Sequence, residues 1–171
     1  MRIVAQTKRI TTLALCVALA GILHVVESWL PMLLPVPGAK LGLANMVSLF
    51  VLAIYGWREA LYVAGLRVVL GSLLGGGFLG PSFVMAMSGA LVSILVMSWS
   101  YRYGRPAFSL VGISVLGATA HNVAQIVAAA VLVASAGLFW YLPYLLLFAL
   151  PTGVFTGYAV ARFLTRTPGW A

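Results

Sequence analysis

The chain has very little charge for its 171 residues. Charged residues make up 7% of it, against roughly 25% in a typical soluble domain; the acids are Glu27 and Glu59, and aspartate is absent. Without aspartate there is no Asp-rich motif for Mg²⁺-dependent diphosphate chemistry and no Ser–His–Asp triad. We therefore do not expect this polypeptide to be an enzyme.

Cysteine and phosphate-binding motifs are also scarce. Cys16 is the single cysteine, so a disulfide framework and a thiolate metal site are excluded. No glycine-rich P-loop occurs, so the chain does not hydrolyse ATP by that route. With two histidines and two acids in all, the residues for a metal site are too few. The sequence requires no cofactor, although a flavin or a quinone is possible as a ligand.

Long hydrophobic runs dominate what is present. Hydrophobic residues make up 63% of the chain and its mean hydropathy is +1.11, which is typical of a protein surrounded by lipid. A spanning helix needs about 20 residues. Apolar runs near or above that length lie at residues 10–30, 41–56, 59–77, 81–100, 109–136 and 139–163. The sequence predicts an all-α, polytopic integral membrane protein with a single transmembrane domain over residues 1–171.

Lysine and arginine gather on one side of this topology. The opposite loops, near residues 31–38, 75–80 and 137–141, contain neither. Because positively charged loops stay in the cytoplasm, we expect six transmembrane helices with both termini cytoplasmic, in the inner membrane of a prokaryote. The net charge of +8 follows from this pattern, so we expect a lipid bilayer and no nucleic acid as partner. The residues on the charged side are Arg2, Lys8, Arg9, Arg58, Arg102, Arg105, Arg162 and Arg166.

Lys40 and Arg67 do not follow this pattern. Arg67 lies midway along the third run, Lys40 lies at the outer start of the second, and Glu27 is the acid at that depth. A charge inside the membrane is costly and indicates function by default. Arg67 either contacts a ligand or pairs with Glu27, whereas Lys40 either competes for that carboxylate or extends to the interface. The local sum is +1, which an anionic or carbonyl-rich ligand would balance.

The fifth run contains the uncharged polar stretch GATAHNVAQ, residues 117–125. At helical spacing, His121, Asn122 and Gln125 share one sector with small residues above and below. An unpaired polar group costs about 4–8 kcal/mol in an alkane-like medium, so neighbouring helices or a ligand must satisfy these side chains. We expect them to line a binding cavity; the alternative is a hydrogen-bond cluster between helices.

Three further polar residues belong to the same predicted outer region. His24 and Glu27 are three residues apart and share a helix face. Asn45 lies one turn into the second run, on the same outer half as Lys40. We include His24, Glu27 and Asn45 among the predicted substrate-binding residues.

Small residues recur at the spacing that lets helices approach closely in lipid. We expect most of these stripes to pack the chain's own bundle, whereas one of them could dock a separate membrane subunit. The stripes are Ala14, Ala18 and Gly21; Ala60, Ala64 and Gly71; Ser82, Ala86, Gly89 and Ser93; and Ala149, Gly153 and Gly157.

Three segments together resemble the Gx transporter family, whose members are often labelled heptaprenyl diphosphate synthase component I. They are VPGAKLGLANMVSLF at 36–50, RVVLGSLLGGGFLGPSFVMAMSGALVS at 67–93 and GATAHNVAQ at 117–125. The resemblance covers residues 10 to about 160. That family is in turn similar to the substrate-binding S components of energy-coupling factor (ECF) vitamin transporters.

The resemblance implies an ECF S-component-like bundle of six helices with a substrate site near the outer face. It also implies an Ala-x-x-x-Ala pattern in the first helix that docks a transmembrane coupling subunit, which works with ATPases. Ala14 and Ala18 match this pattern. The chain is then the membrane-embedded, substrate-binding subunit of a transporter for a vitamin, flavin or isoprenoid-related molecule.

Two other functions stay open at this point. In the first, the polar cluster holds a quinone or flavin for a membrane electron-transfer chain, which a visible or near-ultraviolet spectrum would reveal. In the second, the chain is an accessory subunit of a heptaprenyl diphosphate synthase, as the label suggests. Co-purification with a soluble, Asp-rich partner would favour this second function.

Overall fold

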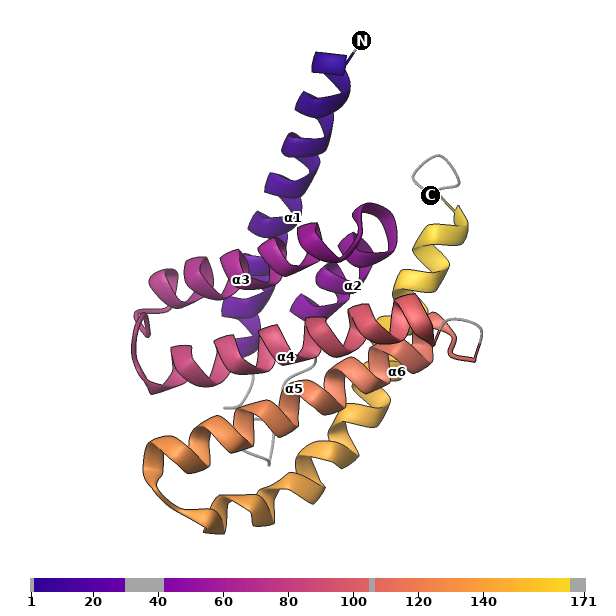
Figure 1. Ribbon diagram of the computed structural model, residues 1–171. Coiled ribbons are helices and arrows are strands. Elements are labelled where there is room, and N and C mark those ends of the chain that lie inside the picture. The colour runs from indigo at the N-terminus through magenta and orange to yellow at the C-terminus, as the bar shows by residue number, and fades with distance from the viewer. Residues whose placement is uncertain (1, 30–41, 105–106, 167–171) are drawn as a thin grey trace.

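The computed structural model describes residues 2–29, 42–104 and 107–166. No strand occurs in this part of the chain, so the predicted all-α class is confirmed (Figure 1). The elements are α1 (Arg2–Trp29), α2 (Leu43–Tyr55), α3 (Trp57–Leu74), α4 (Pro81–Tyr103), α5 (Leu110–Val133), the 3-10 helix η2 (Ala136–Tyr141) and α6 (Leu142–Arg166).

Four helical segments are long and apolar enough to cross a membrane: Gln6–Ser28, Pro81–Tyr103, Leu110–Val133 and Ala136–Arg166. The protein is therefore a multi-pass helical membrane protein. The helix α2 is apolar but has 13 residues, which is about 20 Å of helix against a hydrocarbon core of about 30 Å. The helix α3 has 18 residues, and its charged residues lower its hydropathy.

Local signals set several helix boundaries. The Ser109 hydroxyl accepts a hydrogen bond from the Gly112 N–H at 3.2 Å and so caps the start of α5. Pro81 is the first residue of α4. Its missing N–H costs no helix hydrogen bond, because the first N–H groups of a helix have no partner within that helix. Gly56 separates α2 from α3 with φ 98°, a backbone conformation that favours glycine.

The first, fifth and sixth helices differ in extent from the predicted runs. The helix α1 starts at Arg2 rather than at residue 10, and its N-terminal part projects beyond the other helices (Figure 1). The helix α5 ends at Val133 because Ala134 adopts the left-handed conformation, with φ 51°. A 3-10 segment then precedes α6, in which Pro151 removes one backbone hydrogen bond from the helix interior.

The short helix α2 lies at the centre of the bundle. It contacts α1, α3 and α6, and to a smaller extent α4 and α5. The other helices neighbour one another in the order α1, α3, α4, α5, α6. The largest buried apolar cluster includes Leu49, Val51, Val63, Ile94, Met97 and Ile113, which come from α2, α3, α4 and α5.

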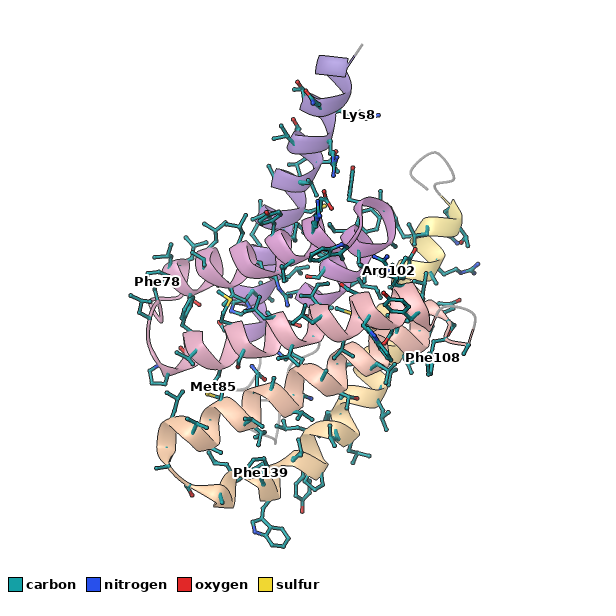
Figure 2. The ribbon with its side chains drawn as sticks, in the orientation of Figure 1. Lys8, Phe78, Met85, Arg102, Phe108 and Phe139 are labelled. Atoms are coloured by element: carbon teal, nitrogen blue, oxygen red, sulfur yellow. The ribbon has the colours of Figure 1, made fainter. Side chains whose placement is uncertain are left out.

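The two ends of the bundle differ in charge. In Figure 1, α3, α4 and α5 lie side by side, and the α3–α4 and α5–α6 connections lie at one end. Figure 2 shows Phe78 and Phe139 at that end, and Arg102 and Phe108 at the opposite one. We call these the aromatic end and the basic end. Arg102 thus lies away from the aromatic end, as the sequence predicts, whereas Lys8 lies on the projecting N-terminal part of α1, apart from both ends (Figure 2).

Glycine brings α6 against the backbone of α5. A Cβ at Gly157 would lie 2.6 Å from the Val111 Cα, and one at Gly153 would lie 2.7 Å from the Val115 Cα. Both distances are too short for any side chain, so the predicted stripe on α6 packs the bundle itself. On α1, by contrast, Ala14 and Ala18 are exposed.

We predict that Gly157→Ala lowers the free energy of unfolding by about 1–3 kcal/mol, because the added methyl forces α6 away from α5. The measurement is the thermal unfolding midpoint in mild detergent. Gly65→Ala in α3 is the matched control, since a Cβ there meets nothing within 4 Å. Equal effects of the two substitutions would contradict close α5–α6 packing.

Candidate functional site

A polar cavity lies where all six helices converge. It has a volume of about 20 Å³, enough for about one water molecule. It lies in the half of the bundle toward the aromatic end, because Arg67 is in the second half of α3 and Ala86 is near the start of α4. Its lining residues are His24, Glu27, Gly42, Asn45, Arg67, Val68, Ala86, Ala118, His121, Asn122 and Thr152.

Arg67 on α3 is the cationic group of this cavity. Its side chain is buried, with 2% exposure, and its Nη2 donates a hydrogen bond to the Asn45 Oδ1 at 2.5 Å. Within the part of the chain that the structure describes, the Arg67 Nε has no hydrogen-bond partner. A buried donor without a partner is costly. The cavity thus offers an N–H group to an oxygen acceptor.

Glu27 holds the start of α2 in place. The residue before α2 is Gly42, which has φ 72° and provides no side-chain cap. The Glu27 Oε1 instead accepts a hydrogen bond from the Leu43 N–H at 2.5 Å. A carboxylate is favourable at a helix N-terminus. Glu27 therefore fixes the turn of α2 that carries Asn45, and through Asn45 it helps to orient Arg67.

The residues of the predicted polar sector of α5 have two roles: some line the cavity and some pack α5 against its neighbouring helices. His121, Asn122 and Gln125 are all buried, but Gln125 is not among the lining residues. A Cβ at Gly89 of α4 would lie 2.9 Å from both the His121 Cε1 and the Gln125 Cγ, so these side chains pack on that glycine. The Asn122 Nδ2 donates to the Leu145 carbonyl of α6 at 2.9 Å, which links α5 to α6.

His24 reaches the cavity because α3 has no side chain in its way. A Cβ at Gly71 would lie 2.5 Å from the His24 Cδ2. The structure thus brings together six predicted site residues, whereas Lys40 lies outside the described residues. The six are His24, Glu27, Asn45, Arg67, His121 and Asn122.

Sequence reasoning missed Thr152 on α6. Its hydroxyl donates to the Phe148 carbonyl at 2.9 Å, yet the residue also lines the cavity. The available signal was its position directly after Pro151, where the helix lacks one backbone hydrogen bond.

The predicted docking residues lie elsewhere, on an exposed groove between α1 and α3. Ala14 and Ala18 line it together with Tyr62 and Leu66 of α3, and its volume is about 490 Å³. Glu59 also lines the groove and forms an ion pair with Arg9, which joins α1 to α3 near the basic end. Ala14 and Ala18 are exposed in this groove, whereas Gly21, the third member of their stripe, is buried.

Comparison with known proteins identifies one family. A family model described as heptaprenyl diphosphate synthase component I matches residues 16–163, a range that includes every residue lining the cavity. This match confirms the resemblance drawn from the sequence motifs. Comparisons with curated proteins and with solved structures give no match.

We predict that Asn45→Leu lowers the free energy of unfolding by about 1.5–3 kcal/mol, because it leaves the buried Arg67 Nη2 without its acceptor. Asn45→Asp keeps an acceptor oxygen and should retain most of the stability. Denaturation in mixed micelles measures both. A comparable loss in the two variants would show that the amide contributes by packing and not by accepting the Arg67 hydrogen bond.

Proposed function

The chain belongs to the heptaprenyl diphosphate synthase component I family, and we propose that it is the membrane-embedded, substrate-binding subunit of a transporter. Its substrate is a small organic molecule, a vitamin or a flavin- or isoprenoid-related compound. The observation that carries this proposal is the cavity to which all six helices contribute polar or small residues. Polar groups inside a lipid-surrounded bundle are expensive, and a substrate site explains their presence.

Arg67 is the anchor for the substrate in this proposal. Its Nε donates to a carbonyl, carboxylate or phosphate oxygen of the bound molecule, while Asn45 keeps the guanidinium in position. His121, Asn122 and Thr152 orient the other polar atoms from α5 and α6. Glu27 and His24 complete the wall on α1.

Substrate entry requires the helices around the cavity to separate. A pocket for a small organic molecule usually has about 300–1,000 Å³, whereas this cavity has about 20 Å³. The α6 segment beside Pro151 is the part of the wall where a helix hydrogen bond is already missing. We propose that α6 bends there to admit the substrate.

For the topology we propose six spans with both termini in the cytoplasm of a prokaryotic cell, so that the aromatic end faces outward. The clustering of Arg58, Arg102 and Arg162 near one end supports this orientation. The short α2 then lies within the protein, where neighbouring helices shield it from lipid. The helix α3 buries its Arg67 and exposes apolar side chains such as Leu66 and Leu70 to lipid. A fluorescent protein that matures only in the cytoplasm, fused to each terminus in turn, tests this arrangement.

A second candidate function is that of an accessory subunit in heptaprenyl diphosphate synthesis. The family description favours it, since a component I implies a partner component. In that case the partner supplies the Mg²⁺-binding carboxylates, because this chain contains no aspartate. Co-purification with a soluble, Asp-rich protein would favour this function over transport.

We predict that a small organic molecule co-purifies with the protein in mild detergent and is detected by mass spectrometry. Arg67→Leu and Asn122→Leu should each weaken its retention by about 10- to 100-fold, because each removes a buried hydrogen-bonding group. Arg162→Leu is the control, because it removes a charge near the end of α6 that does not line the cavity. A flavin or a quinone would be identified by its absorption spectrum.

If the purified protein holds no small molecule, and if uptake by cells is the same with Arg67→Leu as with the unchanged protein, the transport proposal is wrong.

We further propose that the α1–α3 groove docks a transmembrane coupling subunit that works with ATPases. Ala14→Leu with Ala18→Leu fills the groove and should abolish co-purification of that subunit while leaving bound substrate unchanged. Leu15→Phe enlarges an exposed side chain of α1 outside the groove and serves as control. Retained partner in the double variant would exclude this surface.

A further inference from the structure

A second cleft, separate from the polar cavity, opens at the basic end of the bundle. It has a volume of about 710 Å³ and lies between the end of α2, the start of α3 and the last turns of α4. None of its lining residues belongs to the predicted substrate site. They include Trp57, Ser98, Trp99, Tyr101 and Arg102.

The walls of this cleft are aromatic and partly exposed. Trp57 is 46% exposed and Trp99 is 67% exposed. The Tyr101 hydroxyl donates to the Ala53 carbonyl at 3.4 Å, which fixes α4 against the last turn of α2. Tryptophan and tyrosine are enriched where a membrane protein meets the lipid headgroups. The cleft therefore has the composition of a site at headgroup depth.

The positive charge at this cleft has no acidic partner within 4 Å among the described residues. Arg102 lines it, with its Cζ 5.5 Å from the centre of the Tyr103 ring. Arg58 follows Trp57 and its Cζ lies 5.5 Å from the centre of that indole ring. The acid nearest in sequence, Glu59, forms an ion pair with Arg9.

The other acid of the chain, Glu27, lies in the cavity toward the aromatic end. No side-chain carboxylate is therefore available to Arg58 or Arg102. A ligand for this cleft needs an anionic group for the guanidinium groups and an apolar part for the indole rings.

We propose that this cleft binds an anionic phospholipid of the surrounding bilayer through its phosphate group. Guanidinium groups match phosphate oxygens in geometry and charge, and basic pockets between membrane helices bind anionic headgroups. The acyl chains lie along the exposed apolar side of α4, and Trp57 and Trp99 flank the headgroup. The bound lipid bridges the α2–α3 corner and α4. This site does not depend on the substrate-binding proposal.

Native mass spectrometry of the detergent-purified protein tests this site with two lipids, phosphatidylglycerol and phosphatidylcholine. The protein should retain phosphatidylglycerol in preference to phosphatidylcholine. Arg102→Gln should weaken phosphatidylglycerol binding by roughly fivefold, the effect expected of one arginine at a membrane surface. Arg102→Lys keeps the charge and should lose less.

Arg162→Gln is the matched control for this experiment. Arg162 also lies near the end of its helix and also places its Cζ over a tyrosine ring, that of Tyr158 at 5.9 Å, but it does not line the cleft. Binding in this variant should equal that of the unchanged protein. Equal losses in Arg102→Gln and Arg162→Gln, or no preference for phosphatidylglycerol, would overturn the proposal.

Farnesyl diphosphate provides a further arm, because it also joins phosphate to a long apolar chain. Failure of farnesyl diphosphate to displace phosphatidylglycerol supports the bilayer lipid as occupant. Farnesyl diphosphate could instead displace the lipid at a lower concentration than added phosphatidylglycerol does, and Arg102→Gln could remove that effect. In that case the phospholipid assignment is wrong, and the cleft is a site for prenyl diphosphates.

Discussion

The hydrogen bond from the Leu43 N–H to Glu27 is the contact on which the interior of this protein depends. With 13 residues, α2 cannot reach both surfaces of a bilayer, so one of its ends lies inside the bundle. The free N–H groups of that end need an acceptor, and Gly42 has no side chain to provide one. Glu27 supplies it from α1, and this places a carboxylate deep in the protein.

The position of α2 then explains the other polar residues. Asn45 lies in the first turn of α2 and accepts the hydrogen bond of Arg67, so the guanidinium is held by a helix that Glu27 holds in turn. His24 and Asn122 surround the same space, because Gly71 gives room for the imidazole and the Leu145 carbonyl accepts from the amide. The cavity is thus a connected arrangement spanning several helices rather than a collection of separate polar side chains.

Much of this site could be predicted because polar groups in apolar runs are rare and expensive. His24, Glu27, Asn45 and Arg67 were recognisable on that ground alone, whereas the acceptor of the Arg67 hydrogen bond depends on how α2 and α3 pack. Thr152 was missed, since a helical threonine satisfies its hydroxyl on its own backbone. Its position directly after Pro151 was the one signal in the sequence. For the fold, hydropathy located every helix. It did not locate the early start of α1, because residues 2–9 contain three charged residues and no long apolar run.

The basic end follows from the same shortage of acids that shapes the interior. The chain has ten basic residues and two acids, and each acid already serves a contact: Glu27 caps α2, and Glu59 pairs with Arg9. No acidic side chain therefore remains as a counterion for the arginines near the basic end. Headgroup phosphates are the anions available there. In our proposal they balance the charge of the arginines, as Glu27 accepts the hydrogen bond from the start of α2. Arg102, which stands in an aromatic cleft and not on an open surface, is the position where that dependence becomes a specific site.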